Sequence, residues 1–285
     1  MKHLIVPVDF SKESMNGIEL AVLISSKTGA DIQLVYVQKK IPDHFPGSES
    51  EHTKLAKQHF SELIDKYEGK LASNVKLDFI IKKGKVYQEI VNQADAFEDS
   101  AIVVSTHGAS GFEEFFMGSN AFRIVTATTK PVFTIRYGVL PKTIRQIILP
   151  IDVTEQSRQK VPLTAELARL FGSKIHLLTV SSTKDEKVTN KLRAYSRQVA
   201  EYLKDHGVPY LQDSSFGTNV PDKIIEYTTE NNGDLISIMS EQGTNITNVF
   251  LGSYAQQMLN KAPVPVLCIT PKELKILDSF KASGG

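Results

Sequence analysis

Two glycines and a serine in the first half of the chain supply the parts that a phosphate-binding loop needs. Gly108 is followed, after nine residues, by Gly118 and Ser119 at the expected start of a helix. Glycine lets backbone amides approach an anion closely, and a helix N-terminus favours negative charge. Asp9 follows the first apolar run and is suited to accept hydrogen bonds from ribose hydroxyls or an adenine amino group. Together these groups predict a nucleotide site.

Most of this pattern returns in the second half of the chain. Residues 6–11 read VPVDFS, and residues 149–154, which lie 143 positions later, read LPIDVT. Further along, the offset falls to 134 positions, as seen for Gly118 against Gly252. A register held over this length indicates a duplication. We place the roughly nine extra residues of the first copy in the polar stretch 39–50, where turn-forming residues gather.

The segments that position these residues alternate between short apolar runs and longer amphipathic ones. This alternation is typical of β-α-β units and of a parallel sheet, which carries ligands at the carboxyl ends of its strands. The expected strands are 4–8, 31–37, 75–81, 101–104 and 132–135, then 146–151, 174–180, 210–214, 235–238 and 266–269. The expected helices are 11–28, 51–67, 86–96 and 119–128, then 154–170, 187–206, 220–230 and 253–261.

Length and composition favour two ordinary domains. The 285 residues suit a first domain at 1–138, a second at 143–273 and a tail at 274–285.

The 33 basic residues are balanced by 32 acidic ones, which argues against nucleic acid as a partner. No apolar run approaches the length of a membrane span, and the first carboxylate comes too early for a signal peptide. We therefore expect a cytoplasmic protein without a membrane partner. The single cysteine, Cys268, excludes an internal disulfide and is expected in the core.

The first copy resembles the universal stress protein family. The resemblance rests on the VPVDFS opening, on the loop from Ser105 through Gly108 to Gly118 and Ser119, and on the KPV entry to the fifth strand at 130–132. It covers nearly the whole chain as two consecutive family domains. It implies an α/β fold in which each domain is doubly wound, with a five-stranded parallel sheet in the order 3-2-1-4-5 and helices on both faces. It also implies a bound adenine nucleotide, ATP in many members, with Mg as an optional companion.

The resemblance carries site residues over by their positions in the motifs. In the first copy the residues for adenine and ribose are Pro7, Val8, Asp9 and Val37, and those for the phosphates are Ser105, Gly108, Gly118, Ser119 and Asn120. In the second copy the counterparts are Pro150, Asp152, Val180, Gly243, Gly252 and Ser253. Ser105 departs from the family pattern, because it stands where the loop usually begins with glycine.

The second loop departs further from the family pattern. Only eight residues separate Gly243 from Gly252, and Glu241 stands where the first copy has Thr106. A carboxylate near a polyphosphate is disfavoured by charge repulsion. We therefore predict that the first domain is the main nucleotide site. The resemblance to the family implies a protein that acts in stress response or signalling.

Other interpretations stay open at this point. Asp9 could simply cap the helix that follows its strand. The chain could be an interaction scaffold that binds no nucleotide, in which the two halves pair through their fifth strands, 132–135 and 266–269. A homodimer and an unknown protein partner also stay open. Slow ATP hydrolysis is a further alternative. The sequence shows no Ser-His-Asp set, no metal-spaced histidine cluster and no G-x-S-x-G elbow, so we assign no catalytic residue and no metal ligand.

Overall fold

The computed structural model describes residues 1–38, 48–106, 117–136, 138–240 and 251–271. Gly108, Gly243 and the tail 274–285 lie outside the described residues. The first half contains β1 (His3–Pro7), α1 (Lys12–Thr28), β2 (Asp31–Gln38), α2 (Ser48–Glu68), β3 (Leu77–Lys83), α3 (Val86–Asp95), β4 (Ser100–Ser105), α4 (Ser119–Ala127) and β5 (Val132–Ile135). The second half contains β6 (Gln146–Ile151), the 3-10 helix η1 (Gln156–Arg158), α5 (Val161–Phe171), β7 (Lys174–Ser181), α6 (Glu186–Asp205), β8 (Tyr210–Phe216), α7 (Val220–Glu230), β9 (Leu235–Met239), α8 (Ser253–Lys261) and β10 (Val266–Ile269).

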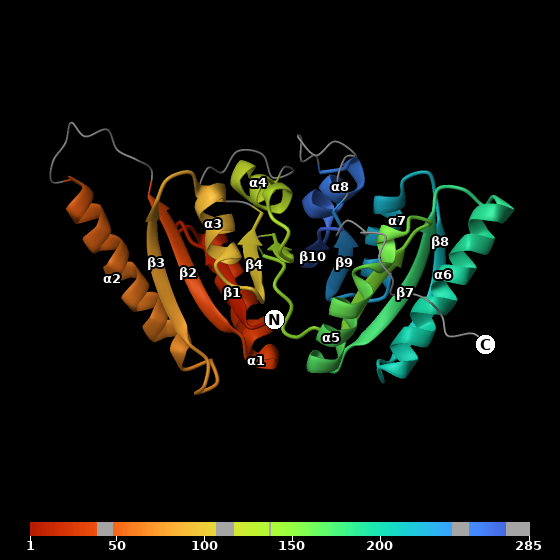
Figure 1. Ribbon diagram of the computed structural model, residues 1–285, viewed down its shortest axis with the longest axis horizontal. Helices are drawn as coiled ribbons and strands as arrows, with labels where there is room; N and C mark the ends of the chain where they lie inside the picture. The colour runs from red at the N-terminus through yellow and green to blue at the C-terminus, as the bar shows by residue number, and fades with distance from the viewer. Residues whose placement is uncertain (39–47, 107–116, 137, 241–250, 272–285) are drawn as a thin grey trace.

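The described strands form one ten-stranded sheet in the order β3-β2-β1-β4-β5-β10-β9-β6-β7-β8. Each half is parallel and has the predicted order 3-2-1-4-5, so the expected α/β fold is confirmed. The halves join at the centre, where β5 and β10 pair antiparallel and Val132 lies opposite Cys268. The fifth strands therefore pair within a single chain, and α2 and α6 lie at opposite ends of the molecule (Figure 1).

The two faces of the sheet each carry a hydrophobic core that runs through both halves. Along β1, Leu4 and Val6 face the core under α1, α2, α5 and α6, whereas Ile5 faces the core under α3, α4, α7 and α8. All three side chains are fully buried, because helices cover both faces of a parallel sheet. Among the described residues, none of the helices combines the length and the apolar character that crossing a membrane requires.

Local signals explain where the first helix begins and ends. The Ser11 hydroxyl accepts a hydrogen bond from the Ser14 amide at 3.1 Å, which makes Ser11 the N-cap of α1. Gly29 ends the helix in the left-handed region at φ 69°, where a side chain would be strained. Ser11 and Gly29 therefore set the two ends of α1.

The corresponding helix of the second half was expected from 154 onward, and this expectation is wrong at its start. The chain first forms η1, and α5 begins only at Val161. Ser157 explains the difference, since its hydroxyl donates to the carbonyls of Asp152 and Thr154 and stabilises a tight turn there. Pro162, in the first turn of α5, favours a helix start at this position.

Cys268 lies in the central strand β10 and is 2 % exposed. Burial raises the pKa of its thiol to about 12, so the group stays protonated and unreactive at neutral pH. The expected core position of this cysteine is confirmed.

Candidate functional site

The residues expected at the first site gather at the carboxyl ends of neighbouring strands. Asp9 follows β1, Val37 lies near the end of β2, and Ser105 ends β4. Because β1 pairs with both β2 and β4, these three positions share one edge of the sheet. The structure thus brings Asp9, Val37 and Ser105 to one edge, while Gly108 lies outside the described residues.

The two aspartates occupy matching turns. In the first half, Asp9 Oδ1 accepts hydrogen bonds from the amide and the hydroxyl of Ser11, at 3.0 and 2.5 Å. In the second half, Asp152 Oδ1 accepts from the amide and the hydroxyl of Thr154, the former at 2.7 Å. Neither aspartate is the N-cap of the helix that follows, because Ser11 has that role in α1 and Glu155 has it in η1. The cap interpretation of Asp9 is therefore wrong, and its carboxylate is instead held in a fixed orientation.

Phe10 gives the first turn an unusual backbone. Its φ is 63°, in the left-handed region, which costs a residue with a bulky side chain on the order of 1 kcal/mol or more. The ring is held by Tyr36, His59 and Phe60, with all three ring centroids 5.0 Å away. This aromatic packing offsets the strain and anchors the turn that carries Asp9.

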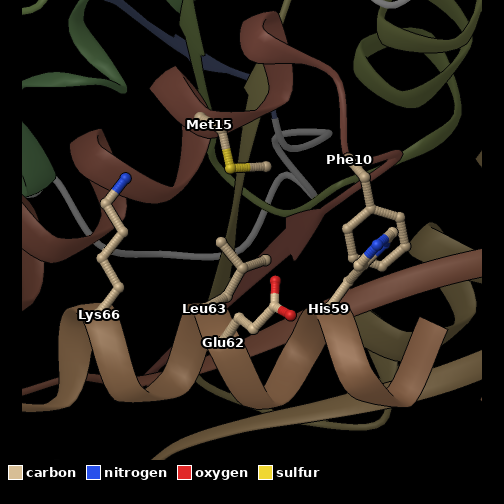
Figure 2. A pocket seen from close by; sticks show the side chains of 6 residues that line it. All are labelled: Phe10, Met15, His59, Glu62, Leu63 and Lys66. Atoms are coloured by element: carbon tan, nitrogen blue, oxygen red, sulfur yellow. The ribbon is translucent and has the colours of Figure 1, made fainter. Parts of the chain in front are cut away.

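A hollow of about 310 Å³ lies beside this ring, between α1 and α2. Figure 2 shows its lining side chains: His59, Glu62, Leu63 and Lys66 project from α2 toward Met15 and Phe10. Acidic, basic and apolar groups alternate here, so the lining does not favour one class of ligand.

The second half has a larger cavity at the corresponding edge. Its volume is about 610 Å³, within the range of sites for small molecules. Three expected residues line it, namely Asp152, Val180 and Ser253. It is also lined by the segment 218–221 and by Tyr254 and Gln257 from the first turns of α8. The structure therefore combines in one cavity residues that lie far apart in the sequence.

Both halves present a helix N-terminus to this edge. Gly118 is the N-cap of α4 and Gly252 is the N-cap of α8, and neither helix has an acidic residue in its first turn. The Gly118 amide donates to the Thr106 carbonyl at 2.5 Å, which ties the helix start to the end of β4. The backbone amides in the first turn of a helix are suited to an anion.

Ser105 and Asn260 add polar groups beside the first helix start. The Ser105 hydroxyl is buried and has no hydrogen-bond partner in the described part of the chain. Asn260, which belongs to α8 of the second half, accepts a hydrogen bond from the Met117 amide at 2.6 Å. Sequence reasoning missed Asn260, because nothing local to α8 indicates a contact with residue 117.

Lys160 is a buried cation behind the second site. It is 3 % exposed, and its ammonium donates to the Ser157 carbonyl at 2.5 Å. Burial lowers the pKa of Lys160 to about 8, against the opposing attraction of Asp152. The first half has Gly17 at the equivalent position, so this charge is particular to the second half. In the sequence, the only indication of this buried charge is that Lys160 directly precedes Val161, the first residue of α5.

Metal ligands are not clustered in this part of the molecule. Across the described residues, no group of three or more His, Cys, Asp or Glu side chains is placed to hold a metal ion.

The strand order, the internal repeat and the residues at the carboxyl edges define a tandem pair of Rossmann-like α/β domains. The model of the universal stress protein family matches residues 1–136 and 143–270. The chain therefore belongs to the universal stress protein family and has two family domains.

Known universal stress proteins match either nearly the whole chain or one of its halves. Universal stress protein Slr1230 of Synechocystis is 24 % identical over 294 residues, covering 94 % of this chain and 99 % of its own. Universal stress protein MJ0531 of Methanocaldococcus jannaschii is 28 % identical over 142 residues, covering 47 % of this chain and 82 % of its own. A solved universal stress protein from Archaeoglobus fulgidus has a TM-score of 0.76 at 19 % identity, with 94 % of this chain and 98 % of that chain covered. The last comparison supports the fold.

Proposed function

We propose that this chain binds an adenine nucleotide, ATP in the first instance, at the carboxyl edges of its two domains, and that it acts in stress response or signalling. The observation that carries the proposal is the cavity of about 610 Å³ that unites Asp152, Val180 and Ser253. Members of the universal stress protein family bind adenine nucleotides, and one solved member is in complex with cAMP.

The geometry suggests a role for each group. The carboxylate of Asp152 is fixed by Thr154, so it can accept hydrogen bonds from ribose hydroxyls without losing much freedom on binding. Val180 is 3 % exposed and offers an apolar wall to the base. Ser253 offers both its amide and its hydroxyl to phosphate at the start of α8. Asp9, Val37 and Ser119 have the same roles in the first domain.

We retain the first domain as the stronger site. Its loop has the nine-residue spacing between Gly108 and Gly118, whereas the second loop is one residue shorter and has Glu241 at the position of Thr106. Both loops lie outside the described residues, so this ranking rests on the sequence and on charge repulsion. A Mg²⁺ ion would enter with the polyphosphate and be held mainly by its oxygens.

Calorimetric titration with ATP tests the proposal domain by domain. Asp9→Ala should weaken binding at the stronger site and Asp152→Ala at the weaker one, each by about tenfold, since a charge-assisted hydrogen bond is lost. Asp78→Ala is the matched control, because Asp78 is an exposed strand aspartate outside the proposed site. Absence of ATP binding, of a thermal shift with ATP and of copurifying nucleotide would refute the proposal and leave the scaffold interpretation.

A further inference from the structure

A second cavity of the second domain lies on the other face of the sheet. Its volume is about 640 Å³, and it is bounded by α6, by the ends of β7 and β8, and by the loop that joins β7 to α6. We refer to it as the cationic cavity. The lining residues used in the argument are Lys184, Arg193, Arg197, Gln212, Ser214 and Phe216.

The cationic cavity has three positive side chains and no carboxylate in its lining. Arg193 and Arg197 are four residues apart on α6, so their guanidinium groups lie on the same face of the helix and repel each other. Among the described residues, none of the three cations is in a salt bridge. Lys184 lies 5.7 Å from the centre of the Phe216 ring, a cation–π contact that leaves its charge uncompensated.

Two acidic residues that neighbour lining residues in the sequence are engaged elsewhere. Asp213 lies between two lining residues of β8, but its side chain faces the opposite side of the sheet. There, burial and the charge of Asp213 raise the pKa of Tyr227 to about 12. Asp185 caps α6, accepting from the amides of Lys187 and Val188 at 2.9 and 3.3 Å. Neither carboxylate lines the cationic cavity.

The first domain closes the same space with aromatic side chains. Strand register makes Phe79 the counterpart of Gln212, because Phe79 pairs with Leu34 and Gln212 with Leu177, and Leu34 and Leu177 are 143 positions apart. Phe60 of α2 is fully buried and stacks on Phe79 with ring centroids 4.5 Å apart. The two domains thus share one scaffold, and the second has polar and cationic groups where the first has packed rings.

From this contrast we propose that the cationic cavity is a binding site for a small molecule that carries a phosphate or pyrophosphate group. Arginine forks bind phosphate oxygens in pairs, and two of them on successive helical turns can clamp one anion. The bound anion would relieve the repulsion between Arg193 and Arg197. Gln212, whose amide donates to Ser196 Oγ at 3.0 Å, and Ser214 supply neutral polar groups for the rest of the ligand. The site lies on the opposite face from α7 and α8, so it is separate from the proposed nucleotide cavity.

Titration of the full chain with inorganic pyrophosphate, in buffer free of divalent cations, tests the proposal. The wild-type chain should bind, and the double variant Arg193→Gln, Arg197→Gln should bind at least tenfold more weakly. Gln212→Phe, which restores the first domain's residue, should have a similar effect by filling the cavity. Arg169→Gln is the matched control, an exposed arginine of α5 outside the lining, and should bind like the wild type.

Three results would overturn the proposal. Absence of wild-type binding is the first. Binding that survives both the double variant and Gln212→Phe would come from another place, such as the start of α8. An equal loss with Arg169→Gln would show only nonspecific charge attraction. ATP titrations of the same variants separate the two sites, because the cavity variants should leave binding at the proposed nucleotide site unchanged.

Discussion

Lys160 makes the stability of this protein depend on pH in a specific way. Its ammonium is buried, and its pKa falls from 10.5 in the unfolded chain to about 8 in the folded one. Between these values the unfolded state binds more protons, so stability rises as the pH increases from about 8 to above 10. A shift of this size corresponds to about 3 kcal/mol that the charged amine costs the folded state near neutral pH.

The substitution Lys160→Met isolates this effect. Methionine keeps the unbranched shape and removes the charge, at the cost of leaving the Ser157 carbonyl without its donor, which is worth about 1 to 3 kcal/mol. At neutral pH, removal of the buried charge raises the free energy of unfolding of the variant, and loss of the donor to Ser157 lowers it. The sign of the difference from the wild type depends on which effect is larger. The decisive quantity is how this difference in the free energy of unfolding changes with pH. Between about pH 7 and pH 10, the free energy of unfolding of the variant should fall by about 2 to 3 kcal/mol relative to that of the wild type.

Urea unfolding curves of both proteins at several pH values measure this change. Other titrating groups are shared by the two chains, so they cancel in the difference between them. Lys187→Met, at an exposed position in the first turn of α6, is the control and should shift stability equally at every pH. If the difference between Lys160→Met and the wild type is also constant over this range, the reasoning from burial is wrong.

Two further predictions concern contacts between the halves. Asn260→Leu removes the acceptor of the Met117 amide at the end of the first phosphate loop, next to the start of α4, so ATP binding in the first domain should weaken several-fold. Equal affinities in calorimetry would exclude a positioning role for Asn260. Phe133→Ala empties a fully buried position in β5 at the central junction and should lower the free energy of unfolding by about 3 to 5 kcal/mol. A loss below about 1 kcal/mol in urea unfolding would show that the junction is not tightly packed.

Much of the fold follows from local patterns in the chain. The β-branched runs, the amphipathic segments and caps such as Ser11 and Gly29 predict the order of strands and helices, since these signals act within a few residues. The start of α5 was missed, because the turn at Ser157 depends on its own hydroxyl bonding back to Asp152 and Thr154. Serine is known to form such hydrogen bonds with nearby backbone groups. The sequence pattern around Ser157, however, is the same as that of an ordinary helix start.

The sequence by itself determined the duplication, the two α/β domains and the edge at which Asp9, Gly118 and their counterparts lie, because repeats and strand ends are properties of order along the chain. Only the tertiary structure decided that β5 and β10 join the halves into one sheet and that Asn260 reaches the loop of the other domain. It also decided that the space over Gln212 is a cationic cavity while the space over Phe79 is filled. These features depend on the packing of residues that are distant in sequence, which no local pattern contains.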